Sequence, residues 1–468
     1  MARIVVVSNR VSVPSGGDGI KRAGGLEVAL RPALERNGGV WFGWSGKTVP
    51  RADVETHTVC HKNVTYVVTD LSEEDYQEYY NGFANRVLWP ILHFRLDLAE
   101  FARRDLTGYM RVNDHFATEL GKIIEPDDLV WVHDYHLIPI ADALRRRGHA
   151  NRIGFFLHVP MPPPEVLASL PNHEQLIPAL GHYDLVGFQT ETDAANFARY
   201  IAKQTGSTPH FGLTLAGHAM HIGVFPVGIE TEEFCRAARV AAKARIVRAL
   251  KQNAPHLAIG VDRLDYSKGL DLKLEAFSRF LKSNPEWNGK VTFLQIAPKS
   301  RSDIAEYAAM ETELATRSGR INADFGDALW TPVRYVTRAY PRQTLAGFFR
   351  AARAGVVTPL RDGMNLVAKE YVAAQDAEDP GVLILSEFAG AAAELDAALI
   401  VNPNDLDAVA TAIAKALAMP LDERKHRHGL LWKALLKTDI AGWGEKFIKA
   451  LLGPAPVEPA NNAHMAAQ

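Results

Sequence analysis

The chain has little cysteine and no long apolar run. Among its 468 residues are two cysteines, Cys60 and Cys235, which lie far apart without a CxxC motif or a histidine-rich neighbourhood. This scarcity argues against a disulfide framework or a structural zinc site and indicates a reducing, cytoplasmic location. The strand-like run at residues 4–7 is too short for the core of a signal peptide, and no stretch approaches the roughly 20 apolar residues that span a membrane. We therefore expect a soluble protein with no membrane partner.

An excess of charge of one sign is also lacking. The sequence has 52 Lys and Arg against 54 Asp and Glu, which gives a formal net charge of -2. No overall field would attract nucleic acid, so any site for an anion must be built locally. Hydrophobic residues make up 47% of the chain and charged residues 23%, and this composition predicts a folded globular protein rather than a disordered one.

Short runs rich in Val, Ile and Leu recur along the whole chain. In the first half they lie at residues 4–7, 64–68, 129–132, 153–157 and 185–188. In the second half they lie at residues 257–261, 291–297, 354–358, 382–385 and 398–401. A turn and a segment with a helical period of about 3.6 residues follow most of them, which is typical of parallel sheets covered by helices on both faces. We predict the α/β class, with two Rossmann-like domains that face each other across a cleft.

The change from one domain to the other is expected where the strand-like run IGVFPV gives way to the charged helical stretch TEEFCRAARVAAKAR. We place an N-terminal domain at residues 1–235 and a C-terminal domain at residues 236–452, with the last helix as a candidate for return to the N-terminal domain. Residues 453–468 are expected to form a disordered tail. Ligands of open parallel sheets bind beyond the carboxyl ends of the strands, so the residues after each strand are the ones to search for chemistry.

The beginning of the chain has a pattern that suits an anion. The first strand ends in Arg10, and Gly24 and Gly25 open a later helix. Bare backbone N–H groups at a helix N-terminus beside a guanidinium make a cradle for a negative charge. An ordinary strand, loop and helix punctuated by glycine explains the same residues, so this pattern alone leaves both interpretations open.

The run DLVWVHDYHLIPI places His133, Asp134 and His136 at the end of a buried strand. Two histidines beside an aspartate suggest a metal site, but no further cluster of ligands has suitable spacing. A sugar site explains the run better, because the Asp134 carboxylate can accept hydrogen bonds from hydroxyl groups. The next strand ends in His158, another imidazole at the same edge, although a single histidine in such a place more often has a structural role.

Two pairs of cations follow strands of the second half. Arg263 and Lys268 lie in one loop, DRLDYSKG, where they can bind a diphosphate and stabilise the charge that develops as it leaves. A charged loop with a serine that caps a helix is the plainer interpretation of this loop. Lys299 and Arg301, in IAPKSR, follow another strand and are weak signals taken singly.

The segment VVTPLRDGMNLVAKEYVAA is the most specific one. It combines a strand, the turn Arg361-Asp362-Gly363 and a helix from about Asn365. Gly363 lets the backbone approach a ligand, and the helix N-terminus adds N–H donors and the positive end of a dipole for phosphate. Glu370 can hold two neighbouring ribose hydroxyls. An Asp362 that only caps a buried helix is the alternative, but it explains neither the Gly-Met-Asn turn nor the glutamate.

Taken in order, the motifs SNR, AGG, EYYNGFANRVLWP, WVHDYHL, GFFLHVPMP, DRLDYSKGL, QIAPKSR and TPLRDGMNLVAKEYVAA resemble those of the trehalose-6-phosphate synthase family. The resemblance runs from Arg3 to about Phe447 and is highly specific. It implies the two-Rossmann glycosyltransferase fold called GT-B, with an acceptor-binding N-terminal domain and a nucleotide-sugar-binding C-terminal domain. It also implies transfer of glucose from UDP-glucose to glucose 6-phosphate, which gives trehalose 6-phosphate.

The resemblance implies roles for individual residues as well. The acceptor phosphate falls to Arg10, Tyr80, Trp89 and Arg301, and Asp134 binds hydroxyls of the acceptor sugar. The donor diphosphate falls to Gly24, Arg263 and Lys268, with Gly25 beside them, and the glucosyl group to His158 and Asp362. The rest of the donor site comprises backbone groups of Gly363, Met364 and Asn365, then Leu366, Val367 and Glu370 near the uridine and ribose. Tyr340 stands near the base, where the family can carry phenylalanine. The implied catalytic residues are Asp134, His158, Arg263, Lys268 and Asp362.

The resemblance also implies a mechanism. The donor is α-linked and trehalose is α,α-1,1-linked, so configuration is retained, which usually requires a carboxylate nucleophile. The family is thought instead to use a front-face, internal-return route in which the departing β-phosphate oxygen takes the proton of the acceptor hydroxyl. Arg263, Lys268 and the helix start after Gly363 would replace a metal, so we expect no cofactor and no obligatory metal.

Two other functions stay open at this point. One is a catalytically silent sugar-phosphate sensor on the same fold, and the other is a transferase for a different sugar- or cyclitol-phosphate acceptor. The sequence also leaves open the preferred nucleotide, whether UDP, GDP or ADP. It does not decide whether the chain forms a homo-oligomer such as a dimer or tetramer.

Overall fold

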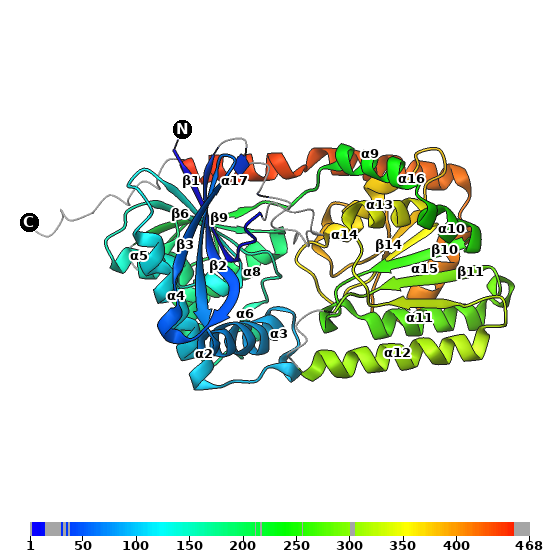
Figure 1. The fold of residues 1–468 in the computed structure, drawn as a ribbon, viewed down its shortest axis with the longest axis horizontal. Coiled ribbons are helices and arrows are strands. Elements are labelled where there is room, and N and C mark those ends of the chain that lie inside the picture. Colours follow the sequence, from blue (N-terminus) through cyan, green and yellow to red (C-terminus); the bar gives the residue numbers. More distant parts are fainter. Residues whose placement is uncertain are drawn as a thin grey trace, which may run out of the picture. The chain divides into compact units, whose positions relative to one another are not determined.

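The computed structural model describes residues 2–14, 30, 34–35, 38–210, 212–215, 218–254, 256–299 and 305–453. The chain forms two compact units, each built around its own sheet (Figure 1). Most of the first unit lies before residue 226, and it also includes the residues from Glu445 onward, while the second unit contains Pro226–Gly444. The chain therefore enters the second unit after Phe225, ahead of the boundary expected after residue 235.

In the described part of the first unit, nine strands form one sheet in the order β3-β4-β2-β1-β5-β6-β7-β9-β8. They are β1 (Ile4–Arg10), β2 (Gly39–Val49), β3 (Thr56–His61), β4 (Val64–Ser72), β5 (Leu129–His133), β6 (Arg152–Phe156), β7 (Leu185–Phe188), β8 (Gly212–Leu215) and β9 (His218–Val224). The edge strands β3 and β8 are antiparallel to their neighbours, and the strands between them run parallel. Strand order reverses between β1 and β5, which is where an open α/β sheet binds its ligand.

The helices of the first unit include an unusual one. The α-helices are α2 (Glu73–Asp75), α3 (Trp89–Leu92), α4 (Arg103–Gly121), α5 (Ile140–Arg146), α6 (Pro164–Leu167), α7 (His173–Leu176) and α8 (Glu191–Thr205). Short 3-10 segments are η1 (Arg51–Asp53), η3 (Leu96–Leu98), η4 (Tyr135–Leu137) and η5 (Ile177–His182). Between α2 and α3 the chain forms a π-helix of 13 residues, η2 (Tyr76–Leu88). Such helices are rare, and they frequently occur at functional sites.

The last helix, α17 (Ile440–Leu452), starts in the second unit and packs its later residues on the first sheet. Phe447 stacks on Trp131 with 4.5 Å between the ring centroids. A Cβ on Gly154 of β6 would lie 2.7 Å from the Phe447 ring, so this glycine makes room for the phenylalanine. Arg152 donates to two backbone oxygens near the helix end. The end of α17 is thus part of the first unit's core.

In the described part of the second unit, six parallel strands form a sheet in the order β12-β11-β10-β13-β14-β15. They are β10 (His256–Val261), β11 (Val291–Ile296), β12 (Val333–Val336), β13 (Ala354–Val357), β14 (Val382–Ser386) and β15 (Leu399–Val401). Numbered along the unit, this order is 3-2-1-4-5-6, that of a doubly wound dinucleotide-binding fold, with its reversal between β10 and β13.

The helices of the second unit cover both faces of its sheet. They are α9 (Thr231–Ala241), α10 (Arg245–Asn253), α11 (Leu270–Ser283), α12 (Ala305–Phe325), α13 (Arg342–Ala351), α14 (Leu366–Ala374), α15 (Leu406–Ala418) and α16 (Leu421–Lys437), with 3-10 segments η6 (Tyr266–Lys268), η7 (Pro285–Trp287) and η8 (Gly390–Ala393). No helix among the described residues is both long and apolar enough to cross a membrane.

Alternate residues of β10 show how the two cores are built. Leu257 and Ile259 belong to the core shared with α9, α13 and α14, whereas Ala258 belongs to the core shared with α11, α12 and α15. In Figure 1, α11 and α12 run along one side of this sheet and α13 and α14 along the other. Burial on both faces explains why the strand is a continuous apolar run. The predicted α/β class with two parallel-sheet domains is confirmed.

Candidate functional site

In the second unit, two loops meet at the reversal of strand order. One follows β10 and spans residues 262–269, and the other follows β13 and spans residues 358–365. The backbone N–H groups of Leu360 and Arg361 donate to the backbone oxygen of Ser267 at 2.8 and 3.3 Å, so the two loops are tied directly. Ligands of a doubly wound sheet bind at this edge, and the loops carry the residues expected to bind the donor.

Lys268 and Asp362 form an ion pair between these loops. Nζ of Lys268 contacts Oδ2 of Asp362, and Nδ2 of Asn365 donates to the same oxygen at 3.0 Å. The side chains of Lys268 and Asp362 are only 11% and 16% exposed. Partial burial strengthens the attraction relative to water, so the pair links the loops electrostatically as well as through their backbones.

Buried polar groups fix the loop that carries Lys268. The fully buried carboxylate of Asp265 accepts hydrogen bonds from N and Oγ of Ser267 at 3.0 and 2.8 Å, and from the hydroxyl of Tyr307 at 3.3 Å. Gly269 ends the turn with a φ of +59°, which glycine adopts without a steric penalty. The turn that carries the Lys268 ammonium group is therefore held by buried hydrogen bonds. Arg263, on the same loop, is exposed.

The turn before α14 packs against a second backbone segment. The N–H of Asp362 donates to the oxygen of Phe388, and the N–H of Gly390 donates to the oxygen of Asp362, both at 3.1 Å. A Cβ on Gly390 would lie 1.9 Å from the backbone oxygen of Gly363, so this close approach requires glycine. Met364 belongs to the hydrophobic core with 4% exposure, which gives its side chain a structural role.

The first turns of α14 carry three more of the expected donor residues. Leu366 and Val367 pack, partly buried, against the core below the helix. Glu370 is held by Arg342, whose Nε donates to Oε1 at 3.1 Å. Burial raises the pKa of Glu370, and the nearby guanidinium partly offsets that rise. The carboxylate therefore has a defined orientation.

Tyr340, expected near the base, lies just before α13. Its ring contacts Phe348 of that helix edge-on at 5.2 Å between centroids. The guanidinium carbon of Arg338 lies 5.8 Å from the Tyr340 ring centroid. Because Arg342 begins α13, one short segment supplies both this aromatic ring and the partner of Glu370.

In the first unit, ring contacts connect the expected acceptor residues. The guanidinium carbon of Arg10, at the end of β1, lies 5.6 Å from the ring centroid of Trp44 in β2. The centroid of Trp44 lies 5.8 Å from that of Tyr80, and Tyr80 stacks on His136 at 5.9 Å with the ring planes 12° apart. These contacts bring together side chains from β1, β2, η2 and the segment after β5.

Trp89 of α3 joins the same group through Tyr135. The Tyr135 ring lies 5.8 Å from that of Trp89 and 4.0 Å from that of His136. Its hydroxyl donates to Oδ1 of Asn85 at 3.1 Å, and Nδ2 of Asn85 donates to the backbone oxygen of Tyr80 at 2.8 Å. A hydrogen bond from the next turn of the π-helix thus helps to fix the backbone of Tyr80, and the Tyr135 hydroxyl orients the asparagine that donates it.

Asp134 occupies an unusual backbone conformation directly after β5. Its φ is +76°, which is uncommon for any residue other than glycine. The N–H of Asp134 donates to the oxygen of Phe156 at 2.8 Å, and Oδ1 accepts from the N–H of His158 at 3.3 Å. The end of the neighbouring strand therefore sets the direction of this carboxylate. Residues held in sparsely populated conformations cluster at functional sites.

The imidazole rings of His133 and His158 contact each other. Nδ1 of His133 and Nε2 of His158 lie 3.1 Å apart. Burial lowers the pKa of His158 to about 3 and lowers the pKa of His133 well below its usual value, so both rings are neutral near pH 7. His136 stacks on Tyr80 instead. Within the described residues, no group of three or more His, Cys, Asp or Glu side chains could hold a metal ion.

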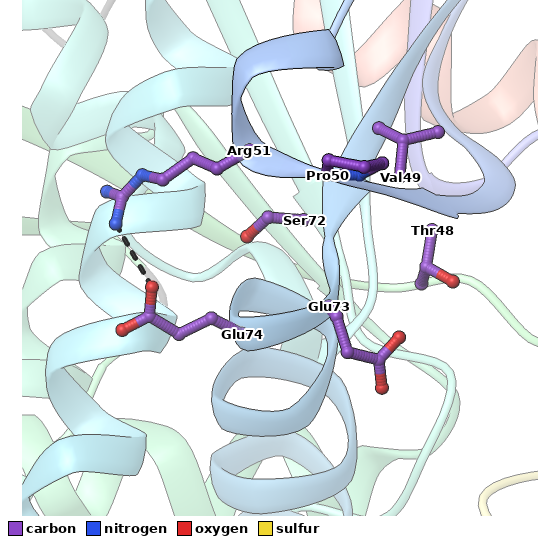
Figure 2. A pocket seen from close by; sticks show the side chains of 7 residues that line it. All are labelled: Thr48, Val49, Pro50, Arg51, Ser72, Glu73 and Glu74. Atoms are coloured by element: carbon purple, nitrogen blue, oxygen red, sulfur yellow. Dashed lines mark hydrogen bonds and ion pairs between the residues drawn. The ribbon is translucent and has the colours of Figure 1, made fainter.

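A cavity of about 430 Å³ lies elsewhere in the first unit (Figure 2). It is lined by residues 48–51, around the end of β2, and residues 72–74, around the start of α2. Nη1 of Arg51 donates to Oε2 of Glu74 at 3.0 Å beside it. None of its lining residues is among those expected to bind substrate, so we do not assign it to the candidate site.

Three of the expected residues, Gly24, Gly25 and Arg301, lie outside the described residues, and their roles stay predictions. The sequence reasoning also missed two side chains. Trp44 lies in a strand that was not expected, and Arg342 lies 28 positions before the glutamate it contacts. The only sequence signal that could have indicated Arg342 is its position just after Tyr340, at the start of a helix.

Comparison with known proteins defines the class of the protein. The model of glycosyltransferase family 20 matches residues 3–452, and the chain belongs to this family. It is 50% identical over 462 residues to a protein of Sinorhizobium fredii named trehalose-6-phosphate synthase, and the match covers 96% of this chain and 98% of that protein.

Two solved structures extend the comparison. One is a UDP-forming α,α-trehalose-phosphate synthase from Burkholderia xenovorans in complex with glucose 6-phosphate, with a TM-score of 0.92, 44% identity and coverage of 97% of this chain and 100% of that one. The other is an E. coli structure bound with UDP-2-fluoro glucose, with a TM-score of 0.90, 45% identity and coverage of 96% and 99%. The family resemblance seen in the motifs is confirmed, and the chain is a glycosyltransferase.

Proposed function

We propose that this chain transfers the glucosyl group of UDP-glucose to glucose 6-phosphate and releases trehalose 6-phosphate and UDP. The family match supports this reaction, as do relatives that are named for it or bound to its ligands. The observation that carries the proposal is the Lys268–Asp362 pair, which lies at the strand-order reversal of a parallel sheet. That position suits a nucleotide sugar.

The donor would be held by residues that follow β10 and β13. Lys268 and Arg263 supply positive charge for the diphosphate, and the N-terminus of α14 adds backbone N–H groups. Asp362 would accept hydrogen bonds from hydroxyls of the glucosyl group. Glu370, oriented by Arg342, would accept them from the ribose. The remaining members of this proposed site are Gly24, Gly25, His158, Tyr340, Gly363, Met364, Asn365, Leu366 and Val367.

Most of the residues proposed for the acceptor belong to the first unit. Arg10, Tyr80 and Trp89 would bind its phosphate together with Arg301, and Asp134 would bind its hydroxyls. The ring contacts that connect Arg10, Tyr80 and Trp89 support this grouping. A guanidinium suits the role because its planar fork of donors matches the geometry of a phosphate.

The chemistry follows from the configuration of donor and product. UDP-glucose is α-linked and trehalose 6-phosphate is α,α-1,1-linked, so the donor carbon keeps its configuration. We propose a front-face reaction with no enzyme nucleophile. The bond from the anomeric carbon to the β-phosphate oxygen breaks, and a bond to the acceptor hydroxyl oxygen forms on the same face. The hydroxyl proton moves to the departing phosphate oxygen, so atoms and charge balance.

The protein's contribution to this step would be orientation and charge stabilisation. Negative charge grows on the β-phosphate as the bond to glucose breaks, and Lys268 and Arg263 would stabilise it. A lysine and an arginine can supply the positive charge that a divalent cation supplies in other sugar-nucleotide enzymes. We therefore include in the proposal that turnover needs no added metal, which activity measured after chelation with EDTA would test.

The acceptor assignment is tested by comparing glucose 6-phosphate with glucose. If the phosphate is bound by Arg10 and its neighbours, its binding energy helps to order the reacting hydroxyl. Glucose should then be a very poor acceptor, with a kcat/KM lower by about 10³-fold or more. Equal kcat/KM for the two acceptors would exclude the assignment. UDP release with transfer of the glucosyl group to water, rather than to either sugar, would favour a transferase for a different acceptor. No UDP release with either acceptor or with other sugar phosphates would favour a silent sensor.

Three further points belong to the proposal and stay predictions. The preference for UDP over GDP or ADP is one of them. The oligomeric state is another, which sedimentation of the purified chain would decide. A reducing, cytoplasmic compartment is the third, and it rests on the two unpaired cysteines, Cys60 and Cys235.

A further inference from the structure

We propose that Asn365 is a positioning residue. Its side-chain amide holds the Asp362 carboxylate in place while Lys268 turns to the diphosphate. This inference rests on the proposed function, because it assigns Asp362 to the glucosyl group and Lys268 to the phosphates. Its basis is that Lys268 and Asn365 contact the same carboxylate oxygen, Oδ2 of Asp362. One of these partners is the ammonium group of a lysine on another loop, and the other is a neutral amide three residues away.

The Asn365 side chain makes two hydrogen bonds in opposite directions. Nδ2 donates to Oδ2 of Asp362 at 3.0 Å, and Oδ1 accepts from the backbone N–H of Ala368 at 3.2 Å. The second bond caps the N-terminus of α14. Asn365 is 8% exposed, so neither bond competes strongly with water. The amide therefore joins the carboxylate to the first turn of the helix.

The backbone at this position restricts which residues can do this. Asn365 has a φ of +77° and a ψ of 82°, in the left-handed region. Glycine visits this region routinely, and among L-residues Asn and Asp do so occasionally. Glycine offers no side chain, and Asp offers the capping oxygen but no donor for a carboxylate. Asparagine alone among the three satisfies the backbone, the cap and Asp362 together.

The arrangement has a consequence for donor binding. When the diphosphate arrives, Lys268 can exchange the carboxylate for phosphate oxygens, because both are anions within reach of a flexible ammonium group. Asp362 would then lose its charged partner. The bond from Asn365 keeps its carboxylate oriented, since the Asp362 backbone is also fixed by hydrogen bonds to Phe388 and Gly390. A carboxylate that is already oriented loses less conformational entropy when it accepts hydrogen bonds from the sugar hydroxyls.

Two variants separate this role from helix capping. Asn365→Gly keeps the backbone conformation and removes both hydrogen bonds. Asn365→Asp keeps the backbone conformation and the capping oxygen but replaces the donor by a carboxylate that faces Asp362. Asp405→Ala is the matched control, because Oδ1 of Asp405 caps α15 at 2.9 Å from the N–H of Ala408 and lies outside the proposed site.

We expect the three variants to affect thermal stability and turnover differently. Asp405→Ala should lower the melting temperature by about 2–4 °C, as for loss of one cap, and Asn365→Gly by about 1 °C, because glycine in place of a capping residue costs only a few tenths of a kcal/mol. Asn365→Asp should regain most of that loss. Turnover should fall about 10- to 100-fold in both Asn365 variants, as for loss of one hydrogen bond to a charged group, and should be unchanged in Asp405→Ala. In Asn365→Asp the acid limb of the pH–rate profile should also move to higher pH, because two facing carboxylates resist ionising together.

Equilibrium binding distinguishes failure of this inference from failure of the proposed function. Calorimetry with UDP-glucose and with UDP needs neither acceptor nor turnover. We expect Asn365→Gly to bind UDP within about twofold of wild type and UDP-glucose about 10-fold more weakly than wild type. Asn365 would act only as a helix cap if Asn365→Gly kept the wild-type ratio of affinities for UDP-glucose and UDP. The same conclusion would follow if Asn365→Asp recovered turnover together with stability. A wild-type chain that binds UDP-glucose but makes no trehalose 6-phosphate would overturn the proposed function instead.

Discussion

At the scale of single residues, three charged residues of the candidate donor site lie in two ion pairs. Lys268 contacts Asp362, and Arg342 donates to Glu370. In the proposed reaction the donor would meet charged groups that already have partners. The diphosphate would replace Asp362 as the partner of Lys268, and Asn365 would remain as the hydrogen-bond partner of Asp362.

The first residue-scale prediction concerns Lys268. Lys268→Ala should lower kcat by about 10²-fold or more, because the variant loses a cation that stabilises the leaving diphosphate. The fold should persist, since Asn365 still donates to Asp362. Steady-state kinetics with UDP-glucose and glucose 6-phosphate would measure the effect. Lys282→Ala, at an exposed position of α11, is the control and should keep wild-type turnover. A Lys268→Ala enzyme with wild-type kcat would disprove the leaving-group role.

The second residue-scale prediction concerns pH. The pKa of His158 in the folded chain is about 3, against an ordinary value near 6.5, because burial disfavours the charged ring. Between these two values the unfolded chain binds more protons, so the free energy of unfolding should fall as pH is lowered below about 6.5. One such histidine contributes a slope of up to about 1.4 kcal/mol per pH unit.

Urea unfolding at pH 5, 6 and 7 would measure that slope. His158→Gln should reduce it, and His210→Gln, at an exposed position, should leave it unchanged. Because His133 also has a lowered pKa, part of the slope should remain in the His158 variant. An identical slope in His158→Gln and wild type would mean that the buried neutral ring does not link folding to protons.

At the scale of elements, the sequence predicts buried strands well and exposed or interrupted ones poorly. The apolar runs expected as β10 and β13 are strands because both of their faces are covered. In contrast, β3 and β12 are edge strands of mostly exposed or half-buried residues, and β2 was not expected because Gly, Ser and Lys interrupt its apolar run. Nor does a helical period near 3.6 residues distinguish the π-helix η2 from an α-helix.

The candidate site divides in a similar way. Lys268 and Asp362 could be found because motifs follow strands, and the topology brings their loops together. The ring contact of Tyr80 with Trp44 and His136 could not be found, because it joins three elements distant in the chain. The positive φ of Asp134 had no signal either, since sequence favours that conformation mainly at glycine.

The element-scale prediction concerns the turn before α14. Gly390→Ala should displace this turn, because its Cβ would lie 1.9 Å from the backbone oxygen of Gly363. We expect a cost on the order of 2–3 kcal/mol in the free energy of unfolding and a clear loss of turnover. Gly319→Ala in α12 is the control, since its Cβ meets nothing within 4 Å.

The control should be neutral or more stable by about 0.5–1 kcal/mol, because alanine is the better helix former. Thermal unfolding and UDP-release kinetics of both variants would test the pair. If Gly390→Ala matched Gly319→Ala in stability and rate, the packing of residue 390 against Gly363 would not support the donor loop.

At the scale of the whole molecule, each unit has its own reversal of strand order. In the first unit the reversal lies between β1 and β5. Arg10 ends β1 and Asp134 follows β5, and both residues are expected to bind the acceptor. In the second unit it lies between β10 and β13, which are followed by Lys268 and Asp362. The same rule of sheet topology therefore accounts for both groups of residues.

The most direct test of the account is the structure of the product. UDP-glucose labelled with ¹³C at the anomeric carbon is incubated with glucose 6-phosphate and the purified chain, and the product is examined by NMR. The proposed reaction yields one trehalose 6-phosphate for each UDP released, with the labelled carbon still in the α configuration. A labelled carbon in the β configuration, or UDP release without trehalose 6-phosphate, would contradict it.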